Sequence, residues 1–153
     1  MIIISDTSAI TSLIQIHRET LLSSLYQQVV IPEEVAVELK KFHAVIPAFI
    51  QVAAVENRQC FQRLCADVDP GEAAAIALML EGKGDLLLID ERRGREVALR
   101  EGLAIVGLLG VLLQARRAGL IDSLAKTIAE LENTAGFRIS PQLTARAIAA
   151  AGE

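Results

Sequence analysis

Short apolar runs alternate along the chain with stretches of helical periodicity. The apolar runs predict strands at about 2–5, 28–31, 86–89 and 103–106, with a weaker one at 50–55. The stretches between them predict helices at about 8–16, 19–26, 33–41, 57–66, 70–82, 92–101 and 108–118. Short strands that alternate with helices are typical of βαβ units, so the pattern predicts an α/β fold with a mostly parallel sheet.

Several helix ends carry their own signals. Asp69 can cap the helix that begins at Pro70, and Glu72 follows three residues after the cap. Gly102 and Gly119 are expected to end the two helices before them. These signals fix the elements more firmly than periodicity alone.

The chain after Gly119 has a different pattern from the rest. It reads as an amphipathic helix, a short extended "GFRIS", and a final helix that begins near Ser140 or Pro141. Because no linker or repeat separates this part, we expect residues 1–153 to form a single domain. Residues 120–153 would be a C-terminal helical appendage on it.

Two of the predicted strands end on a carboxylate. The run in "MIIISDTSAI" stops at Asp6, and the run in "DLLLIDERRGR" stops at Asp90. In a doubly wound parallel sheet, neighbouring strands end at one edge, and ligands bind in the crevice there. We therefore expect Asp6 and Asp90 to share that edge, although each could also serve only as a cap for the helix that follows.

Two glutamates near helix starts could join the same edge. Glu72 lies in the first turn of its helix, and Glu38 lies one turn into the helix after the second strand. Glu72 could instead be the capping partner of Asp69, and Glu38 could be a solvated helix residue. Glu34 lies four residues before Glu38, a like-charge spacing that costs ~0.2 to 0.5 kcal/mol unless it is offset.

A group of four carboxylates needs protons or a cation to offset its repulsion. A site made of oxygen ligands alone suits Mg²⁺ or Mn²⁺. Such an ion can activate water and stabilise the charge of a phosphodiester transition state. Asp6, Glu38, Glu72 and Asp90 therefore predict phosphodiester hydrolysis.

Composition limits how nucleic acid could bind. The 153 residues carry a net charge of −4, which argues against a broad basic face. Aromatic residues make up 3% with no Trp, which argues against an extended base-stacking platform. Any phosphate contact must be local, and the run Arg92, Arg93, Arg95 and Arg100 after Asp90 is either a phosphate clamp or a solvated helix face.

The sequence lacks the residues that a zinc site or a histidine-based hydrolase would need. The two cysteines of "CFQRLC" have no partner at metal-ligand spacing and are expected to be free thiols, and the two histidines are isolated. No run reaches the ~18 apolar residues that span a membrane, and no basic region precedes the first strand. We expect a cytoplasmic protein without a membrane contact.

Five motifs in order resemble one known family. They are "DTS" after the first strand, "IPEEVAVELKK", "GEAAAIALM", "LLLIDERRGREVALREGLAIVGLLGVL", and the ending "GFRISPQL" with a final "GE". Together they resemble the PIN-domain nucleases, above all small prokaryotic members similar to VapC-type toxins of toxin-antitoxin pairs. The likeness covers nearly the whole chain.

The resemblance implies a fold, an activity and a set of site residues. It implies a three-layer α/β/α sandwich and cleavage of single-stranded RNA with Mg²⁺ or Mn²⁺. The implied partners are a small antitoxin protein and a second copy in a homodimer. Its acidic quartet corresponds to the four carboxylates already named, Ser8 corresponds to a hydroxyl that orients water at the first acid, and Arg92, Arg93 and Arg95 are candidate substrate contacts.

Two positions depart from the family pattern. Glu91 stands where a second Asp often follows the strand, so either Asp90 or Glu91 could face the metal. Leu108 stands where a hydroxyl residue is often expected, which removes a possible contact to metal or substrate. A PIN-like binding module with weak or no nuclease activity is therefore the alternative. An aspartyl-phosphate phosphatase would need an Asp where Ser8 stands.

Overall fold

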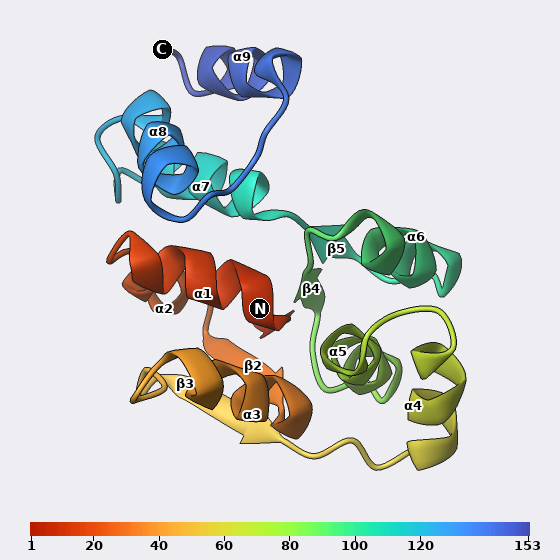
Figure 1. Ribbon diagram of the computed structural model, residues 1–153. Helices are drawn as coiled ribbons and strands as arrows, with labels where there is room; N and C mark the ends of the chain where they lie inside the picture. Colours follow the sequence, from red (N-terminus) through yellow and green to blue (C-terminus); the bar gives the residue numbers. More distant parts are fainter.

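The computed structural model describes residues 1–153, which form one five-stranded sheet and nine helices (Figure 1). The strands are β1 (Ile2–Ser5), β2 (Gln28–Pro32), β3 (Ile50–Ala53), β4 (Leu86–Leu88) and β5 (Ile105–Val106). The helices are α1 (Thr7–Gln15), α2 (Thr20–Leu25), α3 (Glu33–Phe42), α4 (Arg58–Cys65), α5 (Pro70–Leu80), α6 (Arg92–Arg100), α7 (Leu108–Arg117), α8 (Leu124–Thr134) and α9 (Pro141–Ala150).

The sheet has the order β3-β2-β1-β4-β5, and every pair of neighbours is parallel. The predicted parallel sheet is thus confirmed. The chain runs outward from β1 through β2 to β3, then returns to place β4 on the other side of β1. The point between β1 and β4 is therefore the topological switch, where open α/β sheets bind ligands beyond their carboxyl ends.

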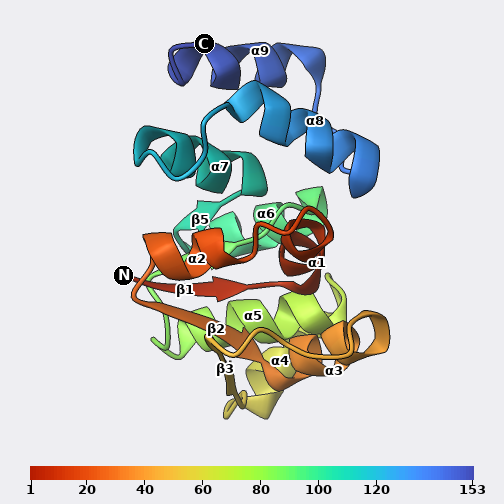
Figure 2. The ribbon, with the colours of Figure 1, turned by 90° about the vertical axis from the view of Figure 1, so that its left-hand side faces the viewer.

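Successive side chains of β1 point to opposite faces of the sheet, as the strand period requires. Ile3 belongs to a core cluster that includes buried residues of α1, α2, α3, α7 and α8. Ile4 belongs to a second cluster on the other face, formed mainly with α4, α5 and α6. The two helical layers around one sheet confirm the α/β/α sandwich. Figure 1 shows α1 and α2 on one side of the strands and α4, α5 and α6 on the other, and Figure 2 looks onto the α1 and α2 side.

The last two helices extend the layer that begins with α7. In both ribbon views α8 packs next to α7, and α9 lies farthest from the strands (Figures 1 and 2). Buried residues of α8 and Ala147 of α9 belong to the first core cluster. No helix in the structure is both long enough and apolar enough to cross a membrane.

Candidate functional site

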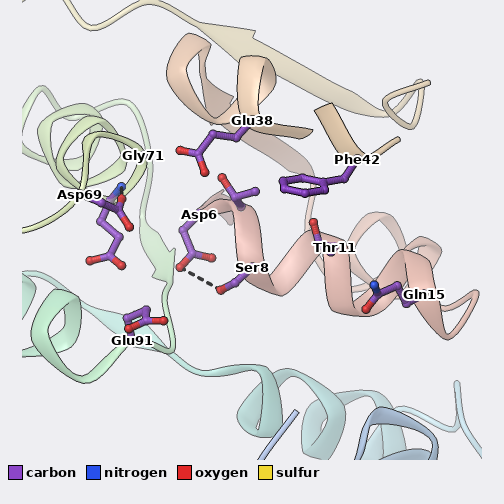
Figure 3. A pocket seen from close by; sticks show the side chains of 11 residues that line it. Asp6, Ser8, Thr11, Gln15, Glu38, Phe42, Asp69, Gly71 and Glu91 are labelled. Atoms are coloured by element: carbon purple, nitrogen blue, oxygen red, sulfur yellow. Dashed lines mark hydrogen bonds between the residues drawn. The ribbon is translucent and has the colours of Figure 1, made fainter. Parts of the chain in front are cut away.

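A pocket of about 360 Å³ opens beyond the carboxyl end of β1 (Figure 3). Five of its eleven lining residues are acidic, none is basic, and one is hydrophobic. Its lining comes from one face along the whole of α1, the second half of α3, the start of α5 and the loop after β4. The lining residues are Asp6, Thr7, Ser8, Thr11, Gln15, Glu38, Phe42, Asp69, Gly71, Glu72 and Glu91.

Asp6 follows the last residue of β1 and is 3% exposed. Its carboxylate is the N-cap of α1, since Oδ1 accepts from the Ala9 N–H at 3.4 Å, while Ser8 Oγ donates to Oδ2 at 3.4 Å. Burial raises the pKa of Asp6 to about 7 against the opposing Ala9 hydrogen bond, and the charges of Asp90 and Asp69 add to the rise. The capping role and a place in the pocket are therefore compatible.

Glu72 is 6% exposed and lies in the first turn of α5. Asp69 caps this helix by accepting from the Glu72 N–H at 2.8 Å, as its position before Pro70 predicts. Burial raises the pKa of the Glu72 carboxyl to about 8, and the neighbouring Asp69 adds to the shift. The carboxyl that the sequence could assign to capping thus belongs to the pocket lining.

Glu38 is half-buried and points into the pocket from α3 (Figure 3). Its carboxylate lies against Gly71 at the start of α5, where an added Cβ would be 2.6 Å from Oε1. Glu34, four residues earlier, forms an ion pair with Arg58 at 3.0 Å. This pair offsets the like-charge repulsion that the spacing of the two glutamates predicts.

Asp90 and Glu91 have different places at the end of β4. Both carboxylate oxygens of Asp90 accept from the Leu108 N–H at 3.1 Å, so Asp90 caps α7 rather than the helix that follows it. Burial raises the pKa of Asp90. Glu91 lines the pocket and Asp90 does not, although the charge of Asp90 contributes to the raised pKa of Asp6.

The arginine run lies outside the pocket lining. Arg92 pairs with Glu96 in its own helix at 3.2 Å. Arg93 pairs with Asp67 at 3.1 Å, and Arg100 pairs with the same carboxylate at 3.1 Å. Arg95 turns back to donate to the carbonyl oxygen at the end of β4 at 2.9 Å. The structure therefore keeps these cations out of the pocket lining, although the charge of Arg95 acts on Asp90 and opposes the rise of its pKa.

Sequence reasoning missed several lining residues. Thr11 and Gln15 follow Ser8 at about one and two turns of α1, and Phe42 follows Glu38 by one turn of α3. Helical spacing places such residues on the face of their predicted neighbours, so it could have found them. Asp69 was assigned to capping alone, yet it lines the pocket as well.

The donor chemistry of the pocket fits a hard divalent cation, because its polar groups are carboxylates, hydroxyls and an amide. The Thr7 hydroxyl oxygen is buried without a hydrogen-bond partner in this lining. No three acidic residues converge closely enough to hold one ion by themselves. An ion bound here would need water to complete its coordination, as is usual for Mg²⁺.

A family model for the PIN domain matches residues 2–153. This chain is a PIN-domain protein. The match covers all five strands and nine helices, α8 and α9 included. Membership indicates a nuclease-type function, and PIN domains in general act on nucleic acid with divalent metals. No curated protein and no solved structure matches the chain.

Proposed function

We propose that this PIN domain is a Mg²⁺- or Mn²⁺-dependent endoribonuclease that cleaves single-stranded RNA in the acidic pocket. The observation that carries the proposal is the buried Asp6 at the switch point of the sheet, in a pocket lined by five acidic residues and no Lys, Arg or His. Its raised pKa and that of Glu72 mean that these carboxyl groups lack the positive charge that would hold them ionised.

Asp6, Glu38 and Glu72 would hold the cation, with Asp90 or Glu91 contributing from the end of β4. A bound divalent ion would supply positive charge to a phosphodiester transition state. Asp6 and Glu72 would each lose a proton when the cation binds, so affinity should rise with pH. Ser8, hydrogen-bonded to Asp6 at 3.4 Å, would orient water beside that carboxylate.

We propose Arg92, Arg93 and Arg95, which follow the pocket residue Glu91 in the first turn of α6, as substrate contacts. The side chain of Arg92 is 94% exposed and would exchange its pair with Glu96 for a phosphate. Arg93 and Arg95 would have to exchange an ion pair or a carbonyl contact for that phosphate. The net charge of −4 leaves such local contacts as the available route to the RNA backbone.

The resemblance to VapC-type proteins leads us to propose a toxin role in the cytoplasm. A small antitoxin protein would hold the nuclease in check, and the nuclease would act as a homodimer. Side chains that remain exposed on α3, β3 and α6 offer apolar area for such contacts, among them Val37, Val52 and Leu99.

A cleavage assay tests the nuclease proposal. Purified protein is incubated with an unstructured RNA and with an RNA hairpin, in Mg²⁺, in Mn²⁺ and in EDTA. We expect internal cleavage of the unstructured RNA with either ion and none in EDTA. Cleavage that persists in EDTA would contradict metal dependence, and preferential cleavage of the hairpin stem would contradict the single-strand preference.

A binding module without nuclease activity is the second candidate. Two observations favour it, since Asp90 is engaged with the Leu108 N–H and no three acids converge. A titration with Mn²⁺ separates the two candidates, because an idle site should bind the ion no better than scattered surface acids. Saturable binding together with cleavage supports the nuclease.

A further inference from the structure

The two ends of the pocket differ in chemistry. Asp69 and Glu91 lie at one end, around Asp6, as Figure 3 shows. Glu72 belongs to the same end, because the charges of Asp69 and Asp6 act on its carboxyl group. The other end, along α1 toward its last turn, holds uncharged side chains. The proposed nuclease chemistry uses only the acidic end.

Phe42 is the one hydrophobic residue of the lining, and it is 72% exposed. It is the last residue of α3 and follows Glu38 by four positions, so the two side chains share a helix face. Nothing in the core needs this ring, because α3 contributes Val35, Ala36 and Leu39 to the core instead. An aromatic ring is thus presented to solvent one helical turn, about 5.4 Å, from a pocket acid.

Polar groups face this ring across the pocket. Ser8, Thr11 and Gln15 form a stripe along α1, and Figure 3 shows Thr11 and Gln15 on the side of Phe42. The Thr11 hydroxyl lies 3.3 Å from Nε2 of His43, the residue after Phe42, which ties the end of α3 to α1. The ring and the stripe are therefore held on two connected helices.

We propose that Phe42, Thr11 and Gln15 form a nucleobase-binding subsite beside the acidic site. The ring of Phe42 stacks on one unpaired base, and the Gln15 amide and the Thr11 hydroxyl face the edge of that base. The assignment rests on the proposed action on single-stranded RNA. The subsite would bind the base, which is the part of the nucleotide that the acidic end does not contact.

The surroundings of the ring fit a base better than an apolar side chain of a partner protein. A docking groove for a hydrophobic residue would surround it with apolar groups, whereas the other ten lining residues offer no hydrophobic side chain. A base has both an apolar face for the ring and a polar edge for the amide and hydroxyl. Stacking also gives affinity without phosphate contacts, which five acids would oppose.

Stacking on Phe42 sets a limit on sequence preference. Every base has a π-face, so the ring alone accepts all four. Selectivity among bases must then come from the Gln15 amide and the Thr11 hydroxyl, which each offer both a donor and an acceptor to the base edge.

A tryptophan at position 42 tests the subsite directly. The chain contains no Trp, so F42W introduces a single tryptophan as reporter, and its ring can still stack. The variant is titrated with hexauridine in EDTA, which prevents metal-dependent cleavage, and with an abasic oligomer that carries the same number of phosphates. We expect saturable quenching by hexauridine and little by the abasic oligomer. Equal quenching by both, or none by either, would overturn the subsite.

Two truncations measure what the ring contributes. We expect F42A to raise the Kd for labelled hexauridine by about 5-fold to 150-fold, the range typical of one stacked base. F42L keeps apolar area without an aromatic face, so it should bind almost as weakly as F42A. Parent affinity in either variant would overturn the proposal. So would a change in oligomeric state of F42A without a loss of RNA affinity, because it would assign the ring to a protein contact.

The outcomes also separate this subsite from the nuclease proposal. Base-dependent quenching without Mn²⁺-dependent cleavage by the parent would refute the nuclease and leave the subsite standing. Cleavage by the parent with unchanged Kd and KM in F42A would refute the subsite alone. For an active enzyme we expect F42A to raise KM more than it lowers kcat.

Discussion

Asp6 and Glu72 are buried carboxyl groups whose neighbours in the pocket are other acids. Their pKa values, about 7 and about 8, lie above the ordinary 3.8 and 4.5, chiefly because of burial. Between the ordinary and the raised pKa values, these two groups therefore hold their protons in the folded protein and lose them in the unfolded chain. Without metal, the folded protein is therefore more stable when these two carboxyl groups are protonated than when they are ionised.

This shift predicts how the stability of the metal-free protein depends on pH. The contribution of Asp6 and Glu72 to the stability of the folded state is fully present below about pH 4. It is lost as pH rises through about 7 and 8. We expect Tm in EDTA to fall between about pH 5.5 and pH 8.5. Asp6→Asn removes one of these titrations and keeps the cap, so its Tm should fall less.

Asp122→Asn is the matched control, since Asp122 is exposed and lies outside the acidic pocket. It should show the same pH dependence as the parent. A parent Tm that stays constant or rises across this range would contradict the raised pKa values.

Glycines leave the space that the carboxylates occupy. A Cβ on Gly71 would lie 2.6 Å from Glu38 Oε1, and a Cβ on Gly94 would lie 2.6 Å from Glu72 Oε2. Both glycines are inside helices, where Gly is less favourable than Ala by up to ~1 kcal/mol. Ala would be the better helix former at both positions, but its Cβ would collide with the carboxylate.

Gly71→Ala is therefore expected to separate stability from activity. The methyl group must displace the flexible end of Glu38, while the helix gains up to ~1 kcal/mol from its better propensity. We expect an unfolding free energy equal to or above that of the parent, measured in urea, with weaker Mn²⁺ binding and slower RNA cleavage. Parent-like Mn²⁺ affinity would show that the position of Glu38 does not matter.

Residue positions could be predicted from the sequence only where local pattern decides them. The ends of two apolar runs place Asp6 and Asp90 at one sheet edge, and the structure has them there. The hydrogen bond between Asp90 and the Leu108 N–H depends on where α7 begins, eighteen positions later, so no local pattern shows it. The exposed ring of Phe42 likewise depends on how α3 meets α1.

At the scale of elements, start and stop signals made the boundaries predictable. Asp69 and Pro70 begin α5 as expected, and Gly102 and Gly119 adopt positive φ after α6 and α7. The helix boundaries predicted up to residue 118 agree with the structure within two residues. The extended "GFRIS" forms no strand, because the sheet ends at the two-residue β5 and has no neighbour for it.

Glu153 joins the C-terminal helices through one carboxylate. It accepts from the Leu124 N–H at 2.7 Å and from the Ala125 N–H at 3.3 Å, and it pairs with Arg116 of α7 at 3.0 Å. These contacts lower its pKa to about 2, led by the Leu124 hydrogen bond. Its contribution to stability is therefore present above about pH 4.5 and is lost as pH falls through about 2.

Glu153→Ala should lower Tm at neutral pH and speed amide hydrogen exchange at Leu124 and Ala125, because both amides lose their acceptor. Glu132→Ala, which removes a carboxylate of α8 that makes no ion pair, is the control. Equal exchange rates in both variants would show that the carboxylate does not hold the start of α8.

At the scale of the whole molecule, α8 and α9 share a core cluster with the sheet. Ile128 and Leu131 are buried in the cluster that contains Ile3. We therefore propose that residues 120–153 are an appendage on a single domain, 1–153. Removal of residues 120–153 would expose the apolar face of α7.

Self-association is also expected of the whole chain. Half of the residues are hydrophobic, at 52%, and β3 is an exposed sheet edge with Val52 open to solvent. We expect light scattering at tens of micromolar to return twice the 16.5 kDa of one chain. A mass of one chain at that concentration would count against the proposed homodimer.

The proposed nuclease function requires that the acids around Asp6 bind a divalent ion at which RNA is hydrolysed. The most direct test follows Mn²⁺-dependent Tm shifts and RNA cleavage in the same samples of the parent, Asp6→Asn and Asp122→Asn. We predict a large shift and cleavage for the parent and Asp122→Asn, because ligand binding stabilises the folded state. Asp6→Asn should show a smaller shift and no cleavage. Cleavage by Asp6→Asn at the parent's rate, with an unchanged shift, would contradict the account.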